Sequence, residues 1–128
     1  MLEIEGKTIK LTRGNILPLT IDADNIIDGD KYNFKVGEVL RFKVMEAKNV
    51  NNVYLEKDFI IEEETTEKDI VLTADEMKIG ELENKPIKYW YEIELNPDTE
   101  YTQTIIGYDK EEGPALLIIL PEGGDKND

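Results

Sequence analysis

Carboxylate side chains crowd one short stretch of the chain, residues 22–30. Four aspartates recur there around Gly29, and hard oxygen ligands at such spacing are the ones that calcium prefers. An EF-hand loop with Gly29 at its sixth position has a lysine, Lys35, at the twelfth position, where a bidentate glutamate is required. We therefore expect a solvated loop without a metal, and an irregular calcium site is the alternative. Its candidate ligands are Asp22, Asp24, Asp28 and Asp30.

A second acidic run, the glutamates at 62–64, follows an apolar segment. Two carboxylates at a suitable separation can hydrolyse a glycosidic bond. Acidic side chains are so abundant in this chain that such a pair arises by chance. We interpret the run as a solvated loop that keeps the neighbouring strand from pairing with other chains.

The chain has 128 residues and contains neither histidine nor cysteine. Histidine is the usual general base near neutral pH and cysteine the strongest side-chain nucleophile, so Ser-His-Asp and Cys-His catalysis and most zinc sites are excluded. The sequence also lacks a glycine-rich phosphate loop and a dinucleotide fingerprint. We predict a non-enzymatic protein with no cofactor and no catalytic residue.

An aromatic group is the remaining candidate site. Tyr89, Trp90 and Tyr91 are consecutive, and Tyr101 and Tyr108 follow on the next predicted strand. Together they could form a platform for sugar rings or a partner surface. The alternative, which we favour, is that alternate members anchor the core of a sandwich.

Composition limits the partners and the compartment. The chain has 29 acidic and 15 basic residues, a formal net charge of −14, so a phosphate backbone would be repelled and no nucleic acid is expected. The longest uncharged apolar stretch, residues 114–121, is too short to span a bilayer. The amino terminus lacks the features of a secretory signal. We expect cytoplasmic synthesis and no membrane partner.

A period of two dominates the sequence. Apolar residues alternate with polar ones at 2–4, 9–11, 17–21, 40–44 and 53–55, and glycine-containing turns separate these runs. This pattern is typical of an antiparallel β-sandwich, which we place at residues 1–121 as a single domain. Residues 122–128 contain nothing to bury, and we predict that this acidic tail is disordered.

Three segments allow more specific structural predictions. Thr73 and Glu76 fit a capping box, and Gly80 fits a left-handed end, which predicts one or two turns of helix. Residues 87–95 and 101–108 flank an Asn-Pro-Asp-Thr turn and predict a hairpin. Residues 115–120 are apolar without alternation, so both faces of that strand need cover, either from this chain or from another subunit. In the second case Leu117 and Ile119 would be interface residues.

Several segments together resemble small β-sandwich proteins of phage and prophage tail and baseplate modules in Gram-positive bacteria, including the amino-terminal domain of baseplate upper proteins. The matching segments are residues 12–21, 36–44, 72–73 with the short helix, 89–95, and the last strand ending at Pro121. The resemblance implies a non-enzymatic structural subunit that is present in several copies. Family members more often carry Gly-Asp where this chain has Gly14-Asn15 and Gly37-Glu38.

The fold that we predict is an all-β, immunoglobulin-like antiparallel sandwich of about seven to nine strands with one short helix. The predicted function is assembly within a tail or baseplate, with other tail proteins or with copies of itself as partners, and association with the virion. The alternative is a module that binds carbohydrate or a cell surface, and an enzyme that uses carboxylates alone is a third candidate.

Overall fold

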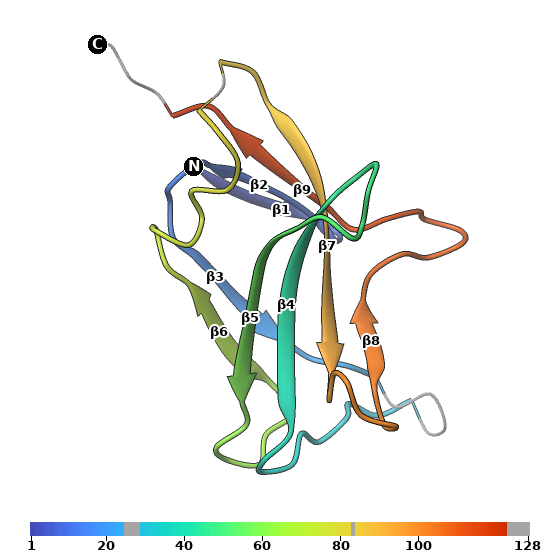
Figure 1. Ribbon diagram of the computed structural model, residues 1–128. Coiled ribbons are helices and arrows are strands. Elements are labelled where there is room, and N and C mark those ends of the chain that lie inside the picture. The colour runs from blue at the N-terminus through green and yellow to red at the C-terminus, as the bar shows by residue number, and fades with distance from the viewer. Residues whose placement is uncertain (25–28, 83, 123–128) are drawn as a thin grey trace.

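The computed structural model describes residues 1–24, 29–82 and 84–122 (Figure 1). The all-β prediction is confirmed, since the described residues form strands, turns and loops without a helix. The strands are β1 (Leu2–Glu5), β2 (Thr8–Thr12), β3 (Leu17–Ile21), β4 (Val39–Glu46), β5 (Val53–Ile60), β6 (Lys68–Leu72), β7 (Ile87–Leu95), β8 (Gln103–Ile106) and β9 (Leu116–Leu120).

Seven of these strands form one large sheet. Its order is β1-β2-β9-β7-β4-β5, and β8 pairs with β7 beside this path. The expectation of a purely antiparallel sheet is wrong, because β2 and β9 run parallel, with Ile9 opposite Leu117. The alternation of apolar residues reports that a segment is a strand but carries no information about the direction of its neighbour.

The other two strands, β3 and β6, form a separate antiparallel pair. Their inward side chains and those of the large sheet bury one core. β7 crosses its centre with strict alternation, so that Tyr89, Tyr91, Ile93 and Leu95 are buried while the residues between them are half-buried. The fully buried members with the largest side chains are Phe34, Phe42, Ile9, Leu11, Leu17, Leu40, Ile61, Ile70, Leu72, Met77, Ile93 and Leu117.

The predicted short helix is absent, although its capping box forms. The Thr73 amide donates to the Glu76 carboxylate at 2.8 Å, and the Glu76 amide donates to Oγ1 of Thr73 at 3.2 Å. A single turn follows, in which the Met77 amide donates to the Thr73 carbonyl at 3.0 Å, but it does not continue as a helix, and Met77 and Ile79 are both buried in the core. Gly80 ends the segment with φ +69°, in the left-handed conformation that was predicted.

The predicted hairpin is present, since β7 and β8 pair antiparallel, but its second strand and its turn differ from the prediction. β7 has the expected bounds, whereas the second strand is limited to Gln103–Ile106. Asn96 and Asp98 both have positive φ, and Thr102 donates to the Thr99 carbonyl, so the connection is a longer loop than the four-residue turn. In the predicted tail, residues 122–128, Glu122 accepts a hydrogen bond from Arg13 at 3.1 Å. The rest of this tail lies outside the described residues.

Candidate functional site

A groove lies on the face of the large sheet that points away from the core. β4 and β7 pair there with Met45 opposite Trp90 and Lys43 opposite Glu92. The groove has a volume of about 300 Å³. It is lined by Lys43, Met45, Val50, Asn51, Trp90, Tyr91, Glu92, Tyr108, Pro114 and Ala115.

One wall of the groove is a loop that interrupts the pairing along one edge of β7. β8 pairs with the end of β7, from Ile93 to Leu95, and β9 pairs with its beginning, from Ile87 to Trp90. The loop between β8 and β9 leaves the sheet and carries Tyr108, which is 67% exposed. The Tyr108 ring stacks on Trp90, with ring centroids 6.2 Å apart and planes inclined by 30°.

The loop is closed on itself by short hydrogen bonds. Asp109 and Gly113 exchange two backbone hydrogen bonds of 2.9 and 2.7 Å. The Asp109 carboxylate also accepts from the amide of Glu111 at 2.7 Å and from that of Glu112 at 3.3 Å. These backbone donors lower the pKa of Asp109. The segment beside Tyr108 is therefore a turn that its own hydrogen bonds hold in one conformation.

Lys7 joins this loop to the core. Its ammonium donates to the carbonyls of Gly107 at 3.0 Å and Gly113 at 2.9 Å, at the two ends of the loop. Its own carbonyl accepts from the hydroxyl of the buried Tyr91 at 2.7 Å. A chain of contacts from Tyr91 through Lys7 therefore holds the loop that positions Tyr108.

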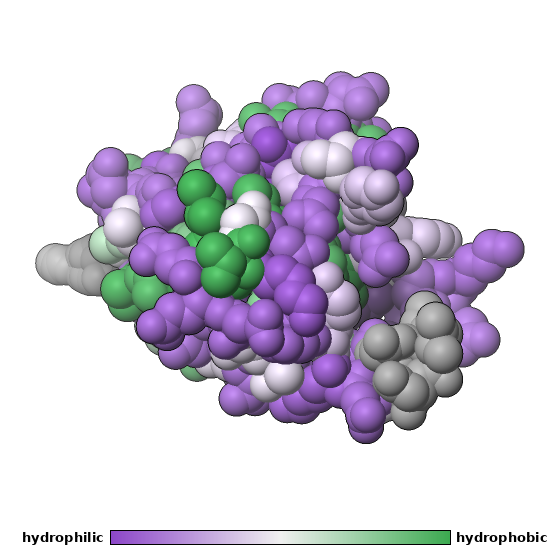
Figure 2. Space-filling view, turned by 90° about the horizontal axis from the view of Figure 1, so that it is seen from below, coloured by the Kyte–Doolittle hydropathy of each residue, from purple (hydrophilic) through white to green (hydrophobic). Residues whose placement is uncertain are grey.

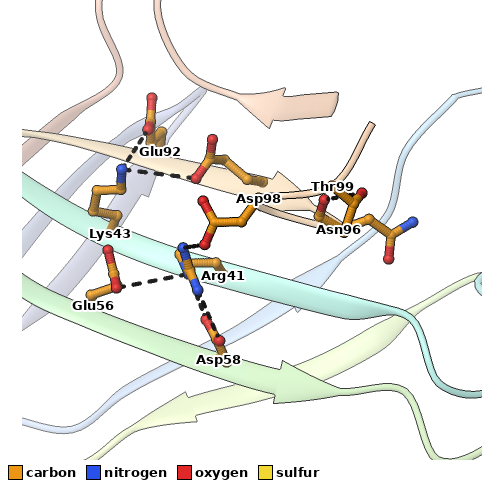
Figure 3. A network of polar contacts seen from close by, with 9 residues as sticks. Arg41, Lys43, Glu56, Asp58, Glu92, Asn96, Asp98 and Thr99 are labelled. Carbon is orange, nitrogen blue, oxygen red and sulfur yellow. Dashed lines mark hydrogen bonds and ion pairs between the residues drawn. The ribbon is translucent and has the colours of Figure 1, made fainter. Parts of the chain in front are cut away.

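The charges in the groove are balanced by an ion pair. Nζ of Lys43 lies 3.5 Å from the Glu92 carboxylate and 3.9 Å from that of Glu94 (Figure 3). The Lys43 and Glu92 side chains are 23% and 25% exposed. The floor of the groove thus offers both hydrogen-bond donors and acceptors while carrying little net charge.

A second polar cluster continues along the same face (Figure 3). Arg41 donates two hydrogen bonds to Asp58, at 2.7 and 3.1 Å, and one to Asp98 at 2.9 Å. These bonds raise the pKa of Arg41, and the hydrogen bond from Arg41 lowers the pKa of Asp58. The cluster ties β4, β5 and the loop after β7 together.

The predicted aromatic group is divided between the two faces of the sheet. Tyr89 and Tyr91 are buried in the core, as the favoured interpretation has it, whereas Trp90 is half-buried on the outer face. Tyr101 is 72% exposed in the loop after β7 and does not line the groove. The structure therefore brings together only Trp90 and Tyr108 as outward-facing members.

The two residues of the last strand that were candidates for an interface lie inside the protein. Leu117 and Ile119 are 0% and 4% exposed, because β9 runs between β2 and β7 with these side chains in the core. The outward residues of the strand, Leu116, Ile118 and Leu120, are half-buried. Any contact between subunits at β9 would use this outward set.

The acidic stretch is held by a lysine in its described part. Nζ of Lys31 lies 3.1 Å from the carboxylates of both Asp22 and Glu67. Asp24 forms an isolated antiparallel β-bridge with Lys31. Asp28 lies outside the described residues. Within residues 1–24, 29–82 and 84–122 no three carboxylates form a group that could hold a metal ion.

Sequence reasoning did not identify Lys43, Asn51 and Glu92 as neighbours of Trp90. Lys43 and Glu92 were visible as polar positions of two strands, but only the register of β4 against β7 places them side by side. Asn51 belongs to the turn before β5, whose approach to the groove has no signal in the sequence.

Comparisons with known proteins found no similar protein. No family model, no curated protein and no solved structure matches this chain. No helix in the part of the chain that the structure describes is long and apolar enough to cross a membrane.

Proposed function

We propose that the chain is a non-enzymatic assembly domain that adds a strand from a different protein to its β5 edge, in a tail or baseplate as the resemblance implies. The observation that carries the proposal is the open edge of β5. This strand has eight residues and, within the described residues, pairs only with β4. Its other side therefore presents unpaired backbone donors and acceptors, which is the template for strand addition.

Exposed apolar side chains lie near both ends of β5 and on the loop before β4. Tyr54 and Ile60 on β5 are 41% and 60% exposed, and Val36, in the loop before β4, is 67% exposed. Gly37 donates to the Ile61 carbonyl, which holds this loop against the end of β5. Figure 2 shows apolar surface on the end of the molecule that is seen from below, where β5 finishes.

The charges of β5 disfavour a second copy of this chain as the partner. In an antiparallel pair, residues directly opposite each other have their side chains on the same face of the sheet. A two-fold axis that relates two copies of β5 must therefore pass beside a single residue, which then lies opposite its own copy. The central residues of β5 are Glu56, Lys57 and Asp58, and centring on any of them puts a charge directly opposite its own copy. Like charges in that position destabilise a pair.

The same charges describe the partner strand. Glu56 and Asp58 share the outer face of the sheet. Leu55, Lys57 and Phe59 point to the other face, where Nζ of Lys57 is paired with the Glu76 carboxylate at 2.9 Å. A complementary strand would carry basic residues on the outer face and apolar residues on the other. Such a strand would come from another protein of the assembly.

The finer fold assignment, an immunoglobulin-like sandwich, belongs to the same proposal. The course of the chain supports it, since it crosses between the two sheets after β2, β3, β5 and β6. Connections that pass from one sheet to the other also occur in immunoglobulin-like domains.

Co-expression with the proteins encoded beside this chain, followed by purification and light scattering, tests the proposed function. The variant is Ile60→Glu at the end of β5. The matched control is Leu82→Glu, which adds the same charge at a site that is 67% exposed and outside the β5 edge. We expect a complex of wild type and control with one neighbour and at least a tenfold weaker complex with Ile60→Glu.

Two results would overturn the proposal. One is that no neighbouring protein binds at all. The other is that Ile60→Glu and Leu82→Glu bind a neighbour equally, which would place the contact elsewhere. The wild-type chain alone should be a monomer, and a stable dimer that Ile60→Glu breaks would refute the argument from the charges of β5.

A further inference from the structure

We propose that the groove between Trp90 and Tyr108 binds an uncharged sugar residue of a polysaccharide. This inference goes beyond the assembly role and does not depend on it, because the groove lies on the outer face of the sheet and the assembly role uses the β5 edge. The sequence suggested an aromatic platform of five residues. The structure restricts it to two rings and adds polar neighbours that the sequence did not identify.

Holding Tyr108 in water costs free energy. The residue is 67% exposed, yet the loop that carries it is closed by the Asp109–Gly113 bonds and braced by Lys7. Apolar ring surface in water is unfavourable, and a ligand that covers it recovers that free energy. Because the loop is already ordered, binding would lose little conformational entropy.

The apolar surface of the groove has a shape that suits a sugar ring. Trp90 and Tyr108 stack on each other with planes 30° apart, and both line the groove, so the ring surface that this contact leaves uncovered borders it. The groove volume of about 300 Å³ is at the lower end of the range for small-molecule sites. The C–H face of a pyranose ring is flat and apolar, and packing it against the exposed surface of Tyr108 beside Trp90 would cover this apolar area.

Charge selects among the ligands that stack on aromatic rings. A phosphorylated ligand or a nucleotide would meet a protein of net charge −14. A cation such as a quaternary ammonium would meet the ammonium of Lys43, which lines the groove beside Glu92. The ligand that fits an aromatic groove with a neutralised ion pair is uncharged.

The polar residues of the groove supply the contacts that such a ligand needs. The Lys43 ammonium can donate to a hydroxyl, the Glu92 carboxylate can accept from one, and the Asn51 amide can do both. All three line the same groove as the two rings. Sugar hydroxyls both donate and accept, so they can use this mixed set fully.

The experiment uses the single tryptophan of the chain as its probe. Trp90 is the only tryptophan, so a change in its fluorescence reports on the groove directly. The probes are the trisaccharides of N-acetylglucosamine, glucose in β1,4 and α1,4 linkage, galactose and mannose, each titrated to about 10 mM, beyond the range of a millimolar Kd. We expect at least one of them to give a saturable change.

Two variants locate the binding site. Tyr108→Ala should weaken the sugar at least tenfold. Tyr101→Ala removes an equally exposed tyrosine outside the groove and should leave the titration unchanged. Thermal melting of each variant, compared with wild type, shows whether it is folded. If Tyr108→Ala does not fold, Lys7→Met takes its place. Lys7→Met frees the loop without touching the groove and should also weaken binding.

Three results would overturn the inference. They are no fluorescence change with any trisaccharide, a saturable change that the folded Tyr108→Ala variant leaves unaltered, and an equal loss in Tyr101→Ala. Ile60→Glu, the assembly variant, should bind the sugar like wild type. The assembly role and the sugar site can therefore fail separately.

Discussion

Tyr91 shows how one residue links the core to the surface of this protein. Its ring stacks on Phe42, with centroids 5.6 Å apart, and its hydroxyl donates to the Lys7 carbonyl at the base of the Tyr108 loop. Burial raises the pKa of this hydroxyl to about 12. The neutral form is thus favoured in the folded protein more than in the unfolded chain.

This shift predicts a stability change in alkaline solution. Above about pH 10, the ordinary tyrosine value, the unfolded chain releases the Tyr91 proton while the folded protein retains it until about pH 12. The free energy of unfolding should therefore fall with rising pH across this window, and less steeply in Tyr91→Phe. Urea unfolding of both proteins at several pH values measures this, and parallel pH profiles would contradict it.

At the scale of elements, Gly80 shows why the chain turns where it does. It has φ +69°, and a Cβ at this position would collide with the hydroxyl of Tyr89. Gly6 has a similar φ of +62°, but a Cβ there would meet nothing within 4 Å. The two glycines therefore separate the cost of backbone conformation from the cost of a steric clash.

We expect Gly6→Ala to lower the free energy of unfolding by about 1 kcal/mol, the cost of left-handed backbone for a residue with a Cβ. Gly80→Ala should cost about 3 kcal/mol, because Tyr89 must also move out of its packed position. Urea unfolding monitored by circular dichroism measures both values. Equal losses would mean that the contact with Tyr89 relaxes freely.

The elements also show what the sequence could and could not predict. Strict alternation fixed β7 to the residue, and the capping box at Thr73 formed, because both depend on neighbours close in the chain. The helix after Thr73 failed because Met77 and Ile79 enter the core, which is a long-range effect.

The candidate site depends almost wholly on such long-range effects. Alternation along the strand puts Trp90 on the opposite face from Tyr89 and Tyr91, but it does not say which face is buried. The partner of Trp90, Tyr108, and the brace from Lys7 come from parts of the chain about a hundred residues apart, which only the sheet order brings together. A single sequence carries no local signal for that order.

For the molecule as a whole, the excess of negative charge sets the response to salt. Salt weakens the surface ion pairs, which destabilises the fold, and also screens the mutual repulsion of a chain with net charge −14. We expect the screening of repulsion to outweigh the weakening of the ion pairs, because acidic residues outnumber basic ones about two to one. The melting temperature should therefore rise by a few degrees between about 0.01 and 0.5 M NaCl.

A charge-reduced variant provides the control for this prediction. Replacing Glu62, Glu63 and Glu64 with glutamine removes three negative charges from an exposed segment that makes few contacts. Its melting temperature should depend less on salt than that of wild type, as followed by scanning calorimetry. A fall in wild-type melting temperature with added salt would show that the ion pairs dominate.

The parallel pairing of β2 with β9 has a consequence for synthesis on the ribosome. Ile9 and Leu11 leave the ribosome before their neighbours in the sheet, Leu117 and Ile119, which lie about a hundred residues later in the chain. Until then β2 has only β1 beside it in the large sheet, and a two-stranded hairpin is marginal in water. Completion of the large sheet must therefore wait until β9 has left the ribosome, and a chaperone that covers β1 and β2 could act while the residues between β2 and β9 are made.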